Sequence, residues 1–132
     1  MIKRRQEFTL EGRLPALNEI ISANRENRFS GARQKARAGE MVRMEIRKEA
    51  LTRMQPPVRI TARFYERDRR RDPDGIFSGG WKIILDALQQ EGIIGNDNQR
   101  WLPGPMPLIP ELYIDAKNPR IEVTLEEVRT DG

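Results

Sequence analysis

The sequence predicts an α+β protein: a single small domain in which a mixed β-sheet carries two main helices packed largely on one face. The 132 residues suit one hydrophobic core. Alternating and helical hydrophobic periods follow one another in the order strand, helix, strand, helix, strands. We find no internal repeat and no inter-domain linker, so we expect one domain over residues 1–132.

The first half of the chain predicts one strand and two helices. Residues 6–10 alternate between apolar and polar side chains, and Gly12 ends this strand. Pro15 can open a short helix through residue 21. A longer helix is expected from about residue 32 to residue 54, because apolar residues recur every four positions until two prolines end it. These apolar residues are Val42, Ile46, Ala50 and Met54.

The second half predicts a strand, a helix and a terminal pair of strands. The clearest strand covers residues 58–67, with Val58, Ile60, Ala62 and Phe64 on one face. Gly, Pro and Asp predict a loop over 72–80, followed by a helix that stops at Gly92. Four prolines predict a loop over 102–110. Segments 111–115 and 120–128 are expected to pair as a hairpin.

The amino-acid composition excludes several kinds of chemistry. The chain contains no cysteine and no histidine, which excludes disulfide bonds, zinc sites built from these residues, and catalysis by histidine. Carboxylates are the remaining metal ligands, and they favour hard cations such as Mg²⁺ or Mn²⁺. A net charge of +4, carried mainly by arginine, favours a polyanionic partner because guanidinium groups bind phosphate well.

Nothing in the sequence predicts a membrane protein. The N-terminal segment lacks the apolar stretch of a signal peptide, and no segment is long enough to span a bilayer. We therefore expect a soluble intracellular protein with no membrane partner.

An arginine run leads directly into two aspartates in the stretch RDRRRDPDG, residues 67–75. The simplest interpretation of such a stretch is a solvated charge run that ends in a turn. However, Asp72 and Asp74 are two positions apart, and alternate side chains of an extended segment point the same way. Pro73 disfavours helix at the residue before it and keeps the pair extended. The two carboxylates could therefore converge on one cation.

Further charged residues follow this pair along the chain. Lys82 and Asp86 share one face of the predicted helix, where a surface ion pair is the default interpretation. Asp97 follows in the turn-like segment GNDNQ. Each aspartate alone is more simply structural. Together they place acids at a strand end, on a helix and in the next loop, beside an arginine run.

In this order the residues resemble the RusA-type Holliday junction resolvases. That family has Arg-Asp-x-Asp-Asn at a strand end and Lys-x-x-x-Asp-Ala-Leu on a helix. A glycine follows, and then paired acids with a glutamine two residues on. The match covers roughly residues 69–99. The matching positions here are Asp72, Asp74, Lys82, Asp86, Ala87, Leu88, Gly92, Asp97 and Gln99.

The chain departs from this pattern at three places. Gly75 stands where the family has asparagine, and Asn96 stands where it has the first of the paired acids. The spacer between the second aspartate and Lys82 is also longer than in the shortest members. The position of Lys82 relative to the acids therefore depends on how this spacer folds.

The resemblance implies a metal-dependent endonuclease that cuts four-way DNA junctions as a homodimer, in the cytoplasm of a bacterium or as a phage-encoded protein near the nucleoid. Asp72, Asp74 and Asp97 would hold Mg²⁺, for which Mn²⁺ is expected to substitute. Lys82 would stabilise charge on the scissile phosphate or orient the attacking water, and Asp86 would orient Lys82 without binding metal. Four arginines would bind the flanking DNA backbone: Arg67, Arg69, Arg70 and Arg71.

Two other functions stay open. The chain could be a non-catalytic or degenerate junction-DNA-binding protein of prophage origin. It could also be a nuclease for flaps, forks or nicked duplex, because substrate choice depends on how two sites are spaced in a dimer. 

The roles of two further groups of residues stay open as well. The apolar residues Ile93, Ile94 and Trp101 would line a dimer interface, wedge into the DNA junction or, more simply, pack in the core. Basic residues between 20 and 40 would form a second DNA-contacting arm or a solvated face: Arg25, Arg28, Arg33, Lys35 and Arg37.

Overall fold

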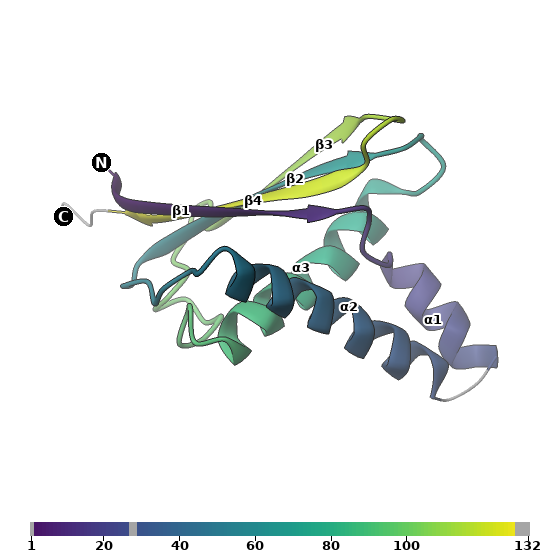
Figure 1. The fold of residues 1–132 in the computed structure, drawn as a ribbon, viewed down its shortest axis with the longest axis horizontal. Helices are drawn as coiled ribbons and strands as arrows, with labels where there is room; N and C mark the ends of the chain where they lie inside the picture. The colour runs from purple at the N-terminus through teal and green to yellow at the C-terminus, as the bar shows by residue number, and fades with distance from the viewer. Residues whose placement is uncertain (1, 27–28, 129–132) are drawn as a thin grey trace.

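Four strands form one mixed sheet, and three helices lie beneath one of its faces (Figure 1). The computed structural model describes residues 2–26 and 29–128. The sheet order is β1-β4-β2-β3, in which β4 is antiparallel to both of its neighbours and β3 is parallel to β2. The predicted fold class, an α+β single domain, is confirmed. The strands are β1 (Ile2–Glu11), β2 (Val58–Glu66), β3 (Leu108–Ile114) and β4 (Arg120–Val128), and the helices are α1 (Leu17–Glu26), α2 (Ser30–Lys48) and α3 (Pro73–Gln90).

β2 is the strand that the sequence predicts most clearly, and the structure confirms it. Its inward side chains Val58, Ile60, Ala62 and Phe64 are almost completely buried against the helices. Of the outward side chains, Arg59, Arg63 and Tyr65 are partly exposed, and Thr61 is buried. Period-two alternation marks a strand with one face on the core, and β2 has this pattern because helices cover only one side of the sheet.

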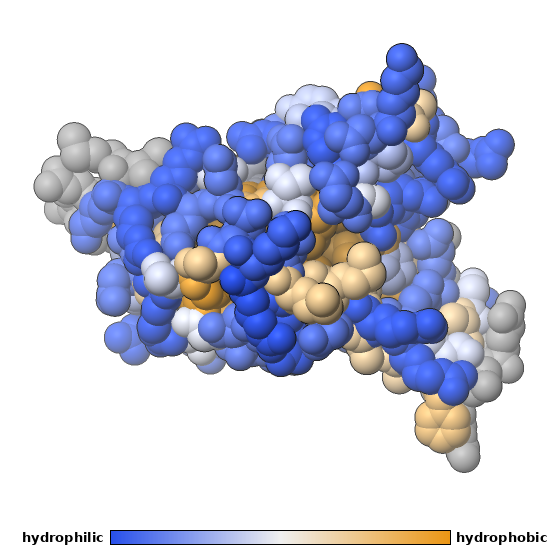
Figure 2. Space-filling model, viewed as in Figure 1, coloured by the Kyte–Doolittle hydropathy of each residue, from blue (hydrophilic) through white to orange (hydrophobic). Residues whose placement is uncertain are grey.

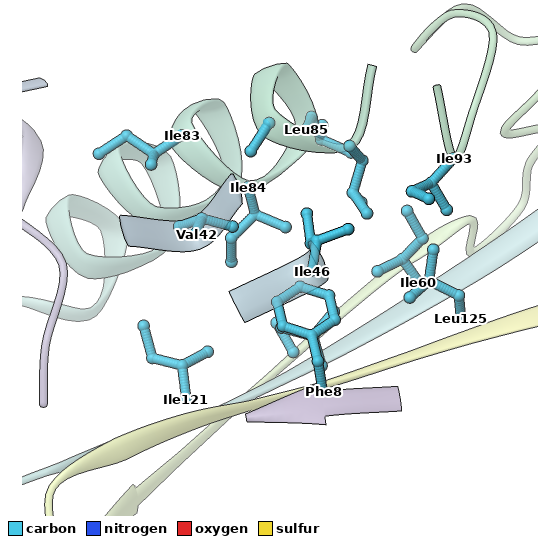
Figure 3. Packing of buried hydrophobic residues seen from close by; sticks show 14 of the residues in the cluster. Phe8, Val42, Ile46, Ile60, Ile83, Ile84, Leu85, Ile93, Ile121 and Leu125 are labelled. Carbon is cyan, nitrogen blue, oxygen red and sulfur yellow. The ribbon is translucent and has the colours of Figure 1, made fainter. Parts of the chain in front are cut away.

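The core lies between the sheet and the two long helices (Figure 3). Phe8 of β1 and Leu125 of β4 meet Val42 and Ile46 of α2, while Ile84 comes from α3. Each fully buried side chain of this size contributes roughly 1.5–3 kcal/mol relative to an exposed one. The open question about three apolar residues is answered in favour of the core, because all three are buried: Ile93, Ile94 and Trp101.

The first two helices differ in their bounds from the prediction. α1 extends to Glu26, past residue 21, and α2 ends at Lys48 rather than at Met54. Ala50 adopts a left-handed backbone with φ of 54°, which turns the chain out of the helix. Met54 is still fully buried because it enters the core from the segment before β2. The four-residue spacing therefore continued past the end of the helix that it predicted.

α3 begins at Pro73, so the prediction of a loop over residues 72–80 is wrong. Asp72 is the N-cap residue and Pro73 takes the first helical position, where its fixed φ suits the helix and its missing N–H costs nothing. The glycines that suggested a loop allow close packing instead. A Cβ added to Gly80 would lie 2.6 Å from the Phe64 ring.

The predicted hairpin of the last two strands is also wrong. β3 pairs with β2, and β4 inserts on the other side of β2. β3 begins at Leu108, inside the segment whose prolines predicted a loop. Pro110 is compatible with β3 because this strand is at the edge of the sheet, where a missing N–H can face away from the neighbouring strand.

Within residues 2–26 and 29–128, no helix combines the length and the apolar character needed to cross a membrane.

Candidate functional site

The two aspartates after the arginine run lie at the N-terminal end of α3. Asp72 makes no side-chain capping hydrogen bond, and the Asp74 carboxylate accepts one from the Gly75 N–H at 2.9 Å. Both residues are exposed. The expectation that Pro73 holds the pair in an extended segment is wrong, because Asp74 is already helical. Two exposed carboxylates within one helical turn still fit Mg²⁺, which commonly takes one or two carboxylates together with water and phosphate oxygens.

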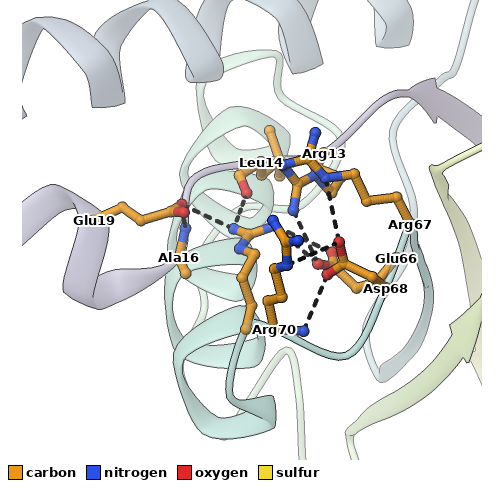
Figure 4. A network of polar contacts seen from close by, with 9 residues as sticks. Arg13, Leu14, Ala16, Glu19, Glu66, Arg67, Asp68 and Arg70 are labelled. Carbon is orange, nitrogen blue, oxygen red and sulfur yellow. Dashed lines mark hydrogen bonds and ion pairs between the residues drawn. The ribbon is translucent and has the colours of Figure 1, made fainter.

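A buried ion pair fixes the segment that carries these aspartates (Figure 4). Arg71 Nη1 donates to both oxygens of Glu66, at 3.2 and 3.1 Å, and Arg13 lies 3.4 Å from the same carboxylate. Arg71 Nη2 donates to the Leu14 carbonyl and to Glu19 Oε1. The end of β2, the start of α1 and the residue before Asp72 are thereby joined. 

Glu66 is the residue of this network that sequence reasoning missed. It is only 3% exposed although it is charged. The available signal was its position, because residue 66 continues the inward-facing series of Val58, Ile60, Ala62 and Phe64. A glutamate at an inward position needs cationic partners, and the following arginine run could supply one.

The four arginines predicted to bind DNA do not share one environment. Arg71 has a side chain only 11% exposed and is committed to Glu66, so the structure places it inside the protein rather than on a DNA-binding surface. Arg67, Arg69 and Arg70 are exposed, and the Arg70 side chain is 84% exposed. Of the four predicted arginines, only these three lie on the surface, where contacts with a DNA backbone would require them to be.

Lys82 pairs with Asp86 on the outer side of α3, as their spacing predicts. The Lys82 Nζ lies 3.4 Å from Asp86 Oδ1. Asp74 and Lys82 are eight positions apart in one helix, which corresponds to about 12 Å along the helix axis. The longer spacer is therefore helical and separates Lys82 from the two aspartates by more than two turns.

Asp97 lies at the opposite end of α3 from Asp72 and Asp74. The segment that contains Asp97 is held beside the beginning of β2, where Met54 N donates to Ile93 O and Val58 N donates to Trp101 O, both at 2.8 Å. The structure therefore does not bring the three predicted metal ligands together within one chain. Among the described residues, no group of three or more acidic side chains could hold a metal ion.

Most charges on the open face of the sheet neutralise one another. Its ion pairs are Arg59 with Glu126, Arg63 with Glu111 and Arg120 with Glu122, at 3.3, 3.2 and 3.0 Å. The Arg120 guanidinium also lies 3.8 Å over the Tyr65 ring, which stacks on Tyr113. This face therefore offers few free cations for a polyanion.

The second basic group lies on α1 and α2. Arg25 of α1 and Arg33 and Arg37 of α2 are exposed, Lys35 is partly exposed, and Arg28 lies outside the described residues. The surface seen in Figure 2, which includes α2, is mostly hydrophilic with a small apolar area. The exposed side chains of Met41 and Met44 belong to α2. 

The far end of α3 is anchored to α2 by Glu91. Arg47 donates to both Glu91 oxygens at 2.8 Å, and Arg43 donates to one at 3.1 Å. The hydrogen bond from Arg47 is the main reason that the pKa of the Glu91 carboxyl lies below its ordinary value. Because Arg43 and Arg47 are committed to this contact, they add little to the free positive surface of α2.

Comparison with known proteins does not place the chain in a family. No protein-family model matches it, and no curated protein matches it. The site is therefore defined by its own residues. Asp72 and Asp74 lie at one end of α3 beside three exposed arginines, and Asp97 lies at the other end.

Proposed function

We propose that the chain is a RusA-type, Mg²⁺-dependent endodeoxyribonuclease that resolves four-way DNA junctions as a homodimer in the cytoplasm of a bacterium. The observation that carries this proposal is the N-terminal end of α3. There, two exposed aspartates, one of them free of a capping contact, follow three exposed arginines, with the mostly buried Arg71 between the two groups.

The chemistry of this helix end suits a phosphodiester substrate. Arg67, Arg69 and Arg70 are exposed. Arg67 and Arg70 make only long surface ion pairs with Asp68, at 3.8 and 3.7 Å, which phosphate oxygens of the DNA backbone could replace. Asp72 and Asp74 would be electrostatically repelled by the same phosphates unless a cation lies between them. A hard divalent cation bound by carboxylates resolves this conflict, which is why acids beside arginines favour metal-dependent cleavage over simple binding.

In the proposed mechanism, the residues of the chain bind and orient the DNA. A bound Mg²⁺ supplies polarisation of the scissile phosphate and a water of lowered pKa. Asp72 and Asp74 hold the cation, and the three exposed arginines fix the flanking backbone. Lys82 is too far along α3 to share the phosphate held next to Asp74, so we assign it to a phosphate further along the strand. Asp86 orients the ammonium group of Lys82.

A cleavage assay tests the proposal. Purified protein is expected to nick a synthetic four-way junction in Mg²⁺ and in Mn²⁺. The Asp74→Asn variant should bind the junction with similar affinity and fail to cut it. Glu7→Gln, a change at an exposed position of β1, serves as the matched control and should cut normally. Equal cleavage by Asp74→Asn and the wild type would exclude this site.

A second candidate is a non-catalytic junction-binding protein of prophage origin. The observation in its favour is that no group of three acids forms among the described residues of one chain. Such a protein would bind junctions in a salt-dependent manner but cut none across a series of Mg²⁺ and Mn²⁺ concentrations. Comparing junction, flap, fork and nicked duplex, with cuts mapped on each strand, also identifies the preferred substrate.

A further inference from the structure

A cavity between α1 and α2 lies next to the proposed site but takes no part in it. Its volume is about 540 Å³, and residues of the segment after β1, of both helices and of the segment before α3 line it. Arginine predominates among the polar residues of this lining. These polar residues are Arg13, Glu19, Gln34, Arg37 and Arg71.

One positive charge of this cavity has no partner. Glu66 lies 3.4 Å from Arg13 and 3.1 Å from Arg71, and Glu19 contacts the same Arg71 at 3.1 Å. These two carboxylates balance the two guanidinium groups (Figure 4). Arg37 is exposed, and no carboxylate within residues 2–26 and 29–128 forms an ion pair with it. The cavity therefore favours an anion.

Two buried polar atoms of the cavity lining also lack a hydrogen-bond partner. Arg71 donates through Nη1 and Nη2 to the network around Glu66, whereas its buried Nε–H meets no acceptor. The buried Oε1 of Gln34 meets no donor. Buried polar groups nearly always have a partner, so these two atoms mark the inner wall as incomplete within the described chain.

The available groups fit a phosphate. Its oxygens accept several hydrogen bonds at once, and guanidinium groups are well suited to donate them. Arg37 can reach a phosphate from the solvent side. Arg13 uses only Nη1 in its contact with Glu66, so its other N–H groups can donate. On the inner wall, Arg71 Nε–H needs an acceptor. The Gln34 amide can turn to present its NH₂ group in place of its oxygen.

Other kinds of ligand fit the cavity less well. A cation would meet three arginines, and the one carboxylate of the lining, Glu19, is already paired with Arg71. An apolar molecule would leave the inner polar atoms without partners and would cover the charge of Arg37. A phosphate group avoids both problems because it is anionic and accepts hydrogen bonds on several sides.

We propose that this cavity is a phosphate-binding site, with Arg13 and Arg37 at its entrance and Arg71 Nε and Gln34 at its inner wall. Arg71 directly precedes Asp72, so the cavity and the proposed metal ligands lie at the same end of the molecule. A phosphate of a DNA backbone and a free phosphate ion offer the same chemistry. Binding of DNA here rests on the proposed function, whereas binding of the free ion does not.

Phosphate binding is tested first without DNA. Calorimetric titration of the full chain with inorganic phosphate, at constant ionic strength, should detect binding by the wild type. Arg37→Gln should weaken it about ten-fold or more, because a charge-assisted hydrogen bond is lost. Arg33→Gln is the matched control, since Arg33 is exposed about one turn earlier in α2 and does not line the cavity. Equal losses with both variants would show general electrostatic attraction and overturn the proposal.

Gln34→Leu tests the inner wall without changing the charge. The oxygen that it removes has no partner in the chain, so the variant should unfold in chloride at a temperature no lower than that of the wild type. Phosphate should raise the Tm of the wild type and raise that of Gln34→Leu less. An equal rise in both proteins would contradict the role of Gln34.

A second experiment measures the affinity for a labelled four-way junction over a range of salt concentrations. Arg37→Gln should reduce the slope of log K against log salt by about 0.9, the value for one phosphate contact, while Arg33→Gln should leave it unchanged. Methylphosphonate substitution then identifies the phosphate. Neutralising that phosphate should weaken binding by the wild type but not by Arg37→Gln, in which the contact is already absent.

The two experiments separate this proposal from the proposed function. An effect of Arg37→Gln on the junction assigns the cavity to the DNA backbone. An effect with free phosphate alone assigns it to the free ion, and if the protein also binds no junction, the proposed function fails while the phosphate site stands. A junction that is bound and cut, with Arg33→Gln and Arg37→Gln alike in both experiments, would keep the proposed function and overturn the phosphate site.

Discussion

Arg71 Nη1 donates hydrogen bonds to both carboxylate oxygens of Glu66, at 3.2 and 3.1 Å. The two residues close the segment 66–71 into a loop between β2 and α3. Because Arg71 directly precedes Asp72, the ion pair also fixes where the first helical turn of α3 begins. The pair is almost completely removed from solvent, so each residue depends on the other for charge compensation.

Arg71→Ala is expected to destabilise the protein strongly. It leaves the buried Glu66 carboxylate with only the longer contact to Arg13, and breaking a buried ion pair from one side typically costs about 3–5 kcal/mol. Urea unfolding measures this cost. Arg70→Ala, at an exposed neighbouring position, should change the free energy of unfolding by less than about 0.5 kcal/mol. Similar values for both variants would show that the Glu66 contact does not hold the fold.

Gly80→Ala and Gly39→Ala should act in opposite directions, although both glycines are inside helices. The added Cβ at position 80 would lie 2.6 Å from the Phe64 ring, and such overpacking costs about 1–3 kcal/mol. The Cβ at position 39 meets no atom within 4 Å, so the better helix propensity of alanine should add about 0.5–1 kcal/mol. Thermal unfolding of the two variants checks the sign of each change.

Glu91 should stabilise the protein at neutral pH but not in acid. The hydrogen bond from Arg47, helped by Arg43, lowers the pKa of the Glu91 carboxyl in the folded state. Its contribution is therefore complete above the ordinary value of 4.5 and is lost as the pH falls through the lowered folded-state value. Glu91→Gln should be less stable than wild type at pH 7, and the difference should shrink towards pH 3. A difference that is the same at both pH values would contradict this linkage.

Replacing the three exposed arginines should weaken the salt dependence of DNA binding. If Arg67, Arg69 and Arg70 each contact a phosphate, changing all three to glutamine should reduce the slope of log K against log salt by about 2.7. Fluorescence anisotropy with a labelled junction measures the slope.

The control for this experiment is a set of arginines already paired with glutamates on the open face of the sheet. Their replacement by glutamine should leave the slope almost unchanged, and a larger effect there would move the DNA to that face. These arginines are Arg59, Arg63 and Arg120.

Local patterns predicted the elements better than they predicted how the elements meet. The alternation around Ile60 identified β2 because one face of the sheet is buried, and the spacing of Ile84 and Leu88 identified α3. The pairing of β3 was predicted wrongly, because nothing in its residues shows that β4 lies on the far side of β2. Glycine and proline around position 75 suggested a loop, although proline at the first helical position is also a start signal.

The candidate site shows the same limit. The order of Asp72, Asp74 and Asp97 along the chain carries no information about the end of α3 at which each residue lies. The burial of Arg71 was equally hidden, because its partner Glu66 could be recognised only from its inward position on β2. Lys82 and Asp86 were predicted to be in contact because a spacing of four residues in one helix fixes their distance.

The length of α3 sets how far apart the acids at its two ends lie. Asp72 and Asp74 lie at one end and Asp97 near the other, and the helix between them is about 27 Å long, which equals roughly eight base pairs of duplex at 3.4 Å each. A duplex lying along α3 would meet acids near both ends of a span that the protein, and not the DNA sequence, determines. Deleting one turn from the middle of α3 would shorten this span by about 5.4 Å, which is one or two base pairs.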